Sequence, residues 1–250
     1  GIRYDMGIVT GSFAGSSQSA IDINNDGIIS APETSVSSIN TANTTAVNYD
    51  YNYVSYSVGA NYALNNSQSF FARYSRGASA KADRVLFERP AASYLNGDLI
   101  NSLDYLSQAE LGYKHKFSGG YVYGTFFYAK TDEQSGFEAT NPSMVIQNNY
   151  KSLGLEVESA YNVSNKVDLR GSFTYTKAEI TSGSNAGNAP RRQPKLMYNL
   201  IPSYKFSKTN SAGLSFMGQT QAFAQDNNQL VMNGFVLING FVELGITKGL

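Results

Sequence analysis

The residues best placed to do chemistry lie in one stretch, residues 22–33. Oxygen-bearing side chains and one glycine recur there at the spacing D-x-[DN]-x-[DN]-G-x5-E, the pattern of a twelve-residue calcium loop. Ca²⁺ is a hard cation that prefers about seven oxygen ligands. The sequence therefore predicts a Ca²⁺ site, and the alternative is an Asn/Asp-rich turn that matches by chance. The predicted ligands are the side chains of Asp22, Asn24, Asp26, Ser30 and Glu33 and the backbone carbonyl of Ile28.

Other reactive side chains are few. The chain has no cysteine and one histidine, His115, which excludes disulfides, thiolate metal sites and clustered imidazole ligands. His115 stands near a predicted turn, and we expect it at the surface or in a lumen. Glu156 and Glu158 are two residues apart, so they share one face of a strand. One interpretation is that the two carboxylates form a glycosidase pair. We favour the other, that they are solvated residues of a barrel wall and face Arg170.

Two adjacent arginines, Arg191 and Arg192, lie in a predicted loop. They suit an anionic ligand or lipopolysaccharide phosphates, although a charged strand edge is the interpretation that we favour. The sequence contains no Gly-x-Ser-x-Gly nucleophile elbow, phosphate loop or dinucleotide fingerprint. We therefore do not expect an enzyme, and a barrel hydrolase is the least favoured alternative because one histidine leaves no assembled triad.

Composition narrows the class of protein further. Charged residues make up 15% of the 250 residues, against roughly 25% in an ordinary soluble domain. Lys plus Arg and Asp plus Glu both number 19, so the net charge is zero and nothing supports nucleic-acid binding. Hydrophobic residues make up 42%, which argues against disorder. No run of about 18 apolar residues exists, so no membrane-spanning helix is expected.

The elements that position these residues are predicted to be long strands. Apolar and polar side chains alternate with period two over segments of roughly 14 residues, whereas strands in globular proteins average about 5–6. Such a strand reaches about 45 Å, more than a bilayer core requires. The turn and alternation rules predict about ten strands. They lie near residues 2–13, 50–64, 68–78, 102–117, 120–132, 149–162, 166–180, 194–206, 210–223 and 230–246.

Short and long connections take turns along the chain. The short ones are 65–67, 118–119, 164–165 and 207–209, and the long ones are 14–49, 79–101, 133–148, 181–193 and 224–229. In an up-and-down sheet, this places every tight turn at one rim and every long loop at the other, as in outer-membrane barrels. We therefore predict an all-β, antiparallel, up-and-down transmembrane β-barrel with the calcium pattern in an exterior loop.

A soluble β-sandwich with a binding or adhesive role is the alternative, because its sheets also have one wet face. Tyrosines near predicted strand ends favour the membrane, since their amphipathic rings suit the water–lipid interface. They are Tyr51, Tyr53, Tyr113, Tyr121, Tyr123 and Tyr204.

Ordered motifs over most of residues 50–248 resemble the C-terminal part of TonB-dependent outer-membrane receptors. The strand at 53–64 is followed by SFFARYSRG at 69–77, then by the 110–114 and 120–128 hairpin. KSLGLEVE at 151–158 is similar to a further strand of that family, and APRRQPK at 189–195 to the proline pair that opens a later one. Each motif is weak alone; their order and spacing carry the resemblance.

The resemblance implies a role in the bacterial outer membrane. It implies ligand-gated uptake of a scarce nutrient, such as a siderophore, cobalamin or a carbohydrate, driven by the TonB energy-coupling complex acting on a plug. Barrels of this family have about 22 strands, so we expect residues 1–250 to be one segment of a larger barrel, without the plug. Expected partners are membrane lipid and lipopolysaccharide, the nutrient, and the TonB complex through the plug. A passive porin-like channel is the first rival.

Overall fold

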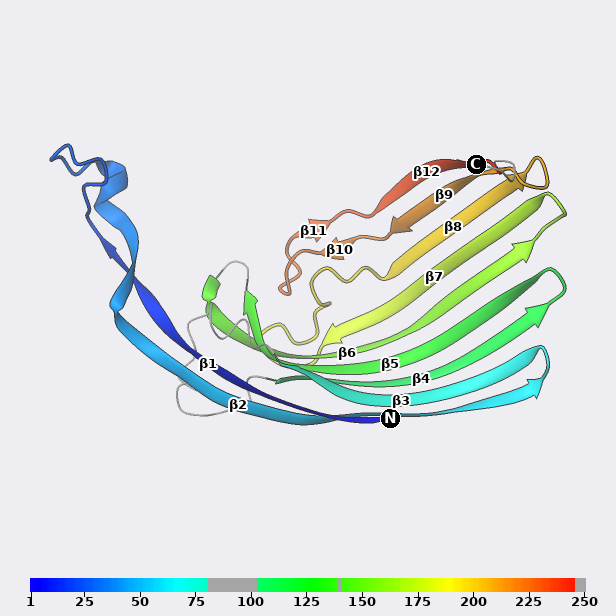
Figure 1. Ribbon diagram of the computed structural model, residues 1–250, viewed down its shortest axis with the longest axis horizontal. Helices are drawn as coiled ribbons and strands as arrows, with labels where there is room; N and C mark the ends of the chain where they lie inside the picture. Colours follow the sequence, from blue (N-terminus) through cyan, green and yellow to red (C-terminus); the bar gives the residue numbers. More distant parts are fainter. Residues whose placement is uncertain (81–102, 139–140, 246–250) are drawn as a thin grey trace.

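The computed structural model describes residues 1–80, 103–138 and 141–245. They form one ten-stranded sheet in the order β1-β2-β3-β4-β5-β6-β7-β8-β9-β12, in which each strand is antiparallel to its neighbours (Figure 1). The predicted number of strands and the up-and-down order are confirmed. The strands are β1 (Ile2–Ser19), β2 (Val36–Asn65), β3 (Gln68–Ala80), β4 (Leu103–Phe117), β5 (Gly120–Glu138), β6 (Asn141–Asn162), β7 (Val167–Ile180), β8 (Leu196–Lys205), β9 (Ser211–Gln219) and β12 (Phe235–Glu243).

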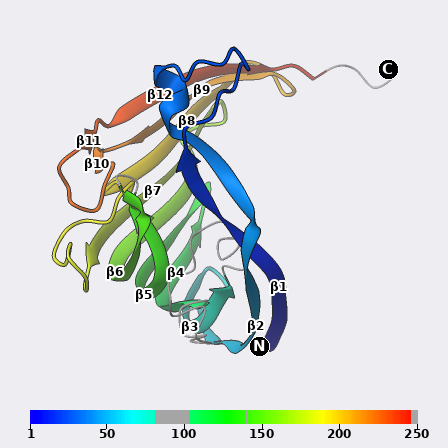
Figure 2. The same ribbon diagram turned by 90° about the vertical axis from the view of Figure 1, so that its left-hand side faces the viewer.

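The sheet curves into an open arc with β1 at one edge and β12 at the other (Figure 2). Among the described residues, no second layer of protein covers the sheet, and the buried apolar side chains are Leu103, Ile180 and Ala222 alone. A soluble sandwich needs two inner faces packed about 10 Å apart. The fold is therefore held by its ladder of backbone hydrogen bonds, and one face of the sheet is apolar and exposed.

All tight turns lie at one end of the strands and the longer connections at the other (Figure 1). The turns at 66–67 and 118–119 join strands almost directly. Gly119 has a φ of +85°, a backbone conformation that residues with a Cβ seldom adopt. The predicted asymmetry between the two rims is confirmed.

Two predicted long connections are largely strand. The connection predicted at 14–49 is strand up to Ser19 and again from Val36, and the one predicted at 133–148 is strand up to Glu138 and again from Asn141. Residues 36–55 of β2 pair, where they pair, with β1 alone, so this hairpin extends beyond the sheet as a two-stranded ribbon. Beyond residues 2–8, whose side chains still alternate, backbone hydrogen bonds hold this ribbon without an apolar pattern. The Ser, Thr and Asn content of this outer part led to a wrong prediction.

The last two predicted strands are each divided. The strand predicted at 210–223 ends at Gln219, and Ala222–Phe223 forms the short β10; the strand predicted at 230–246 becomes β11 (Val231–Met232) and β12. β10 and β11 pair only with each other. Gly234 marks the break, because a Cβ there would lie 2.5 Å from the carbonyl oxygen of Gln219. Of the predicted connection 79–101, Ser79 and Ala80 belong to β3 and the rest lies outside the described residues.

Aromatic rings form a continuous row near the tight-turn rim. The centroids of Phe70 and Tyr113 are 4.9 Å apart, those of Tyr113 and His115 6.1 Å, those of His115 and Phe117 5.6 Å, and those of Phe117 and Tyr161 5.8 Å. Such a row suits the interface between lipid and water. Tyr51 and Tyr53 do not lie at a strand end as predicted, because β2 begins at Val36.

Candidate functional site

The outer face of the sheet is apolar and exposed. Along residues 2–8 of β1 every second side chain is large and apolar, with Ile2 83% exposed. Along residues 54–64 of β2 every second side chain is apolar, with Val58 65% exposed. In water such a surface is unfavourable by roughly 25 cal/mol per Å² of apolar area. Among the described residues, no helix is both long enough and apolar enough to cross a membrane. An exposed apolar band on one face of long, alternating strands is the outer wall of a membrane barrel.

The opposite face carries charged and hydroxyl side chains. Arg73 in β3 pairs with Glu110 in β4, with an Nε–Oε2 distance of 2.8 Å. Farther along, Lys205 in β8 pairs with Asp168 in β7, with an Nζ–Oδ2 distance of 2.5 Å. Residues directly opposite one another in adjacent strands share a face, so these pairs belong to one polar surface. This surface is the one that lines the lumen of a barrel.

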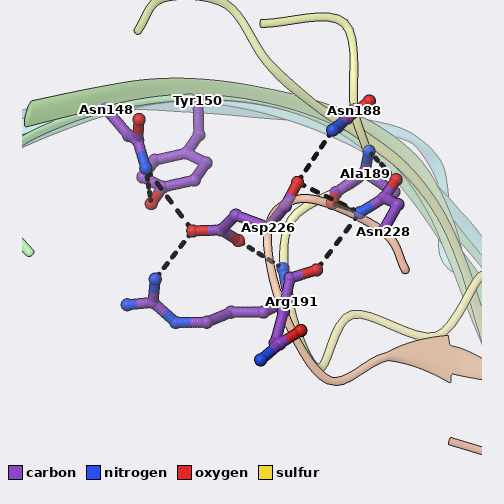
Figure 3. Close-up of polar contacts among 8 residues, drawn as sticks. Asn148, Tyr150, Asn188, Ala189, Arg191, Asp226 and Asn228 are labelled. Carbon is purple, nitrogen blue, oxygen red and sulfur yellow. Dashed lines mark hydrogen bonds and ion pairs between the residues drawn. The ribbon is translucent and has the colours of Figure 1, made fainter. Parts of the chain in front are cut away.

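A buried polar cluster joins the loops at the long-loop end (Figure 3). Asp226, between β10 and β11, has no exposed surface, and its carboxylate accepts hydrogen bonds from Arg191 Nη1 at 2.7 Å and from the Arg191 backbone N–H at 2.8 Å. Asn188 donates to the backbone carbonyl of Asp226 at 2.9 Å. The side chain of Asn228 accepts from the Ala189 N–H and donates to the Ala189 carbonyl. Loop 181–195 and the β10–β11 hairpin are thus held as one unit.

The same cluster reaches the wall of the sheet. Asn148 of β6 is fully buried, and its Nδ2 donates to Asp226 at 3.4 Å and to the Tyr150 hydroxyl at 3.3 Å. A buried carboxylate is tolerated only when it is paired and hydrogen-bonded, and Asp226 satisfies both conditions. The loops therefore rest on the polar face of β6 as a fixed structure.

Two adjoining cavities lie on the polar face beside this cluster. One, of about 670 Å³, is bordered by Arg3, Ser55 and Gly77, and the other, of about 220 Å³, by Tyr150 and Arg191; Asp104 and Thr131 line both. Concave surfaces with a few convergent polar groups are the usual places for small molecules. This hollow at the long-loop end is the candidate ligand-binding site.

The predicted calcium loop occupies the tip of the β1–β2 ribbon. Asp22 accepts hydrogen bonds from the N–H groups of Asp26, at 3.2 Å, and Gly27, at 2.7 Å, and Gly27 has a φ of +80°. Asn24 Nδ2 donates to Asp26 Oδ2 at 2.8 Å, and the Ile28 N–H donates to Asp26 Oδ1. The side chains at the first, third and fifth positions are therefore gathered on one side of the loop.

Glu33 closes this loop from its far end, within the short 3₁₀-helix η1 (Ala31–Ser35). One carboxylate oxygen accepts from the Ile23 N–H at 2.9 Å, and the other accepts from the N–H and hydroxyl of Ser30 at 2.8 and 2.6 Å. These hydrogen bonds, first those from Ser30, lower the pKa of Glu33 from 4.5 to about 2. Within the described residues, no three His, Cys, Asp or Glu side chains are grouped closely enough to hold a metal ion.

The other residues singled out by the sequence are dispersed. His115 lies on the outer face within the aromatic row. Glu158 accepts a hydrogen bond from the Tyr121 hydroxyl at 2.9 Å, and among the described residues no ion pair joins it to Arg170. Arg191 belongs to the buried cluster, whereas Arg192 is exposed. Sequence reasoning missed Asp226, Asn148 and Asn228, because their partners lie up to 78 residues away and no local pattern announces them.

The geometry defines the class: part of the wall of an outer-membrane β-barrel. Residues 18–250 match the family model described as TonB dependent receptor-like, beta-barrel, and the chain belongs to this family. It is a component of the bacterial outer membrane. Among curated proteins, no relative matches.

Solved receptors share the fold. The ferric citrate transporter FecA superposes with a TM-score of 0.69 at 17% identity, over 85% of this chain and 33% of that one. The ferric-catecholate import receptor Fiu of E. coli superposes with a TM-score of 0.64 at 14% identity, over 99% of this chain and 36% of that one. The siderophore receptor PiuA of Acinetobacter baumannii superposes with a TM-score of 0.63 at 16% identity, over 83% of this chain and 32% of that one. The chain thus spans about a third of the length of each.

Proposed function

We propose that this chain is the wall and loop region of a receptor that takes up a scarce nutrient across the outer membrane, energised by the TonB complex. The observation that carries the proposal is the division between an exposed apolar outer face and a polar inner face with a hollow at the long-loop end. Membership of the receptor family supports it. A ferric siderophore is the first candidate ligand, because the similar proteins named above are a ferric citrate transporter, a ferric-catecholate import receptor and a siderophore receptor. Cobalamin and carbohydrates are the other candidates.

A passive porin is the rival function. It requires a constriction loop that presents opposed charges to a water-filled pore. The ion pair between Arg191 and Asp226, in the described loops, does not present opposed charges to a pore. Asp226 is buried, and its carboxylate is paired with Arg191. This arrangement favours a receptor with fixed loops over a pore with an electrostatic constriction.

The test is uptake by cells that express the full-length receptor and lack their own. Radiolabelled ferric citrate, a ferric catecholate, cobalamin and maltohexaose are supplied in turn, with and without an uncoupler that collapses the proton-motive force. We expect saturable uptake of one of these solutes that the uncoupler and deletion of TonB both abolish. Uptake that persists without TonB supports the porin instead.

We further propose that loop 22–33 binds Ca²⁺ through Asp22, Asn24, Asp26, Ser30, Glu33 and the Ile28 carbonyl. Support comes from the complete twelve-residue spacing and from the gathering of the first three side chains by hydrogen bonds. Binding requires Glu33 to exchange its hydrogen bonds from Ile23 and Ser30 for the ion. Its low pKa keeps it ionised for this at every physiological pH.

Calorimetric titration of the receptor with calcium chloride tests this site. We expect Glu33→Gln to lose the binding seen in the unsubstituted protein, because a bidentate carboxylate is replaced by a neutral amide. Glu179→Gln is the control, since Glu179 forms a partly exposed pair with Lys151 far from the loop. Equal and weak heats for Glu33→Gln and the unsubstituted protein would show that the motif binds no calcium.

A further inference from the structure

The outer face of the sheet changes from apolar to basic along three neighbouring strands. β5, β6 and β7 lie side by side (Figure 1), and the following apolar side chains are exposed on them: Phe126, Leu155 and Phe173. Four residues away from these, toward the long-loop end, stand Lys130, Lys151 and Lys177. An even separation along a strand keeps two residues on one face. The three lysines, named here the lysine cluster, therefore belong to the outer face.

The lysine cluster lies one membrane crossing away from the tight turns. A tilted strand crosses a bilayer core in about 9–11 residues. The lysines stand about ten residues from the tight-turn ends of their strands, which are Gly120, Asn162 and Val167. Tyr128 and Tyr175, two residues nearer those turns than Lys130 and Lys177, have rings that suit the water–lipid interface. The cluster is thus at the level of the lipid headgroups, where a lysine charge is tolerated.

The three ammonium groups are close enough to share one anionic group. Lys130 and Lys151 are directly opposite one another in β5 and β6, which places their Cβ atoms about 5 Å apart. Lys177 is opposite Leu153, two residues from Lys151, so Lys177 and Lys151 are diagonal neighbours about 7–8 Å apart. Like charges placed in this way repel one another. A bound anion removes this repulsion.

The protein supplies part of the counter-charge. Lys151 pairs with Glu179, with an Nζ–Oε2 distance of 3.2 Å. Across the described parts of the chain, neither Lys130 nor Lys177 has an acidic partner within ion-pair distance, and both are exposed. Even Asp132, two residues farther along the same face of β5, is beyond that distance. The cluster therefore keeps two free ammonium groups and a net positive charge.

We propose that the lysine cluster binds the phosphate groups of lipopolysaccharide. In outer-membrane barrels the tight turns are periplasmic and the longer loops extracellular, so headgroups at this level belong to the leaflet that faces the exterior. The glycolipid of that leaflet carries phosphates on its sugar backbone. Clustered lysines at a membrane surface attract anionic headgroups, and ammonium-to-phosphate hydrogen bonds are strengthened by the opposite charges.

This site differs from the one that the sequence suggested for such phosphates. Arg191 of the adjacent arginines pairs with the buried carboxylate of Asp226, and that cluster rests on the luminal side of the sheet through Asn148. The lysine cluster is on the opposite face, which meets lipid. The inference depends on the membrane wall and not on the transport of a nutrient.

Lipid binding to the purified full-length receptor tests the site. The receptor is titrated in detergent with lipid A that carries two phosphates, and bound lipid is counted by native mass spectrometry. We expect Lys130→Gln/Lys177→Gln to bind at least about tenfold more weakly than the unsubstituted protein, because each lysine contributes separately to headgroup attraction. The control is Lys114→Gln/Lys116→Gln, which removes the same charge from the luminal face of β4 and should bind normally.

A charge-retaining variant separates loss of charge from loss of folding. Lys130→Arg/Lys177→Arg should bind as tightly as the unsubstituted protein, and weak binding by it would contradict a site based on charge. Heat-modifiable migration on gels verifies that each variant has folded. Equal affinity of Lys130→Gln/Lys177→Gln and the unsubstituted receptor for lipid A would overturn the site.

Two further lipids identify the occupant. Lipid A without phosphates and phosphatidylglycerol should each bind the unsubstituted receptor more weakly than lipid A with two phosphates. Equally tight binding of dephosphorylated lipid A would show that phosphate is not recognised, and equally tight binding of phosphatidylglycerol would overturn the assignment to lipopolysaccharide. Because lipid binding is measured without transport, failure of this inference is distinguishable from failure of the proposed function.

Discussion

Single carboxylates hold the two loop structures of this protein together, by different means. Glu33 accepts hydrogen bonds from both ends of loop 22–33, whereas Asp226, which is fully buried, joins two loops and a strand. Both carboxylates accept hydrogen bonds through both of their oxygens. The contribution of Glu33 can be measured through its response to pH, and that of Asp226 through substitution.

Acid is expected to loosen the tip of the β1–β2 ribbon. The folded pKa of Glu33 is about 2 against 4.5 ordinarily, so the stabilisation is complete above pH 4.5 and is lost as pH falls toward 2. Amide hydrogen exchange at Ile23 and Ser30 measures the effect, as protection factors corrected for intrinsic pH dependence. In Glu33→Gln these amides should show low protection throughout this pH range. If their protection still depended on pH in this variant, another group would be responsible for the effect.

Removing Asp226 is expected to release loop 181–195. Asp226→Ala removes the buried acceptor shared by Arg191 and Asn148, which costs about 1–3 kcal/mol of local stability. Trypsin should then cut after Arg192 much faster than in the unsubstituted receptor. Glu179→Ala is the matched control: its pair with Lys151 is partly exposed and contributes at most about 1 kcal/mol. Equal cleavage of both variants would contradict the role given to the cluster.

At the scale of elements, alternation alone predicted the number, order and direction of the strands. It succeeded where one face meets lipid, because β3, β4 and β7 must then alternate. It failed beyond the membrane, where the β1–β2 and β5–β6 hairpins continue on backbone hydrogen bonds with no apolar pattern. It gave no sign of the Arg191–Asp226 pair, since contacts between loops depend on how the strand ends are brought together.

Glycines in the sheet are expected to differ sharply in their tolerance of substitution. A Cβ at Gly154 in β6 would collide with the Phe127 ring and with the backbone carbonyl of Tyr175, whereas a Cβ at Gly124 in β5 meets nothing within 4 Å. Gly154→Val should lower folding stability by about 1–3 kcal/mol or more, measured by urea unfolding in lipid vesicles. Gly124→Val should be nearly neutral, and an equal loss would point to a general intolerance of β-branched residues.

The residues that the structure describes form a single curved layer with an apolar outer face. With Leu103, Ile180 and Ala222 as the buried apolar residues of the described chain, hydrophobic burial cannot stabilise this sheet in water. Among the described strands, β1 and β12 also form the two edges of the sheet. An apolar outer face is compatible with a stable protein where lipid covers it, and edge strands of this kind are available for pairing with further strands.

Adjacent residues of β6 provide a test of this arrangement. Leu155 points outward and Glu156 inward, at the same depth along the strand. Arginine at Leu155 should reduce folding stability in vesicles by about 2–4 kcal/mol, because a charge near the bilayer midplane loses its hydration. Arginine at Glu156 remains in a hydrated lumen and should change stability much less. If both substitutions cost the same, or if Glu156→Arg costs more, the two faces have been assigned the wrong way round and lipid does not meet the apolar side.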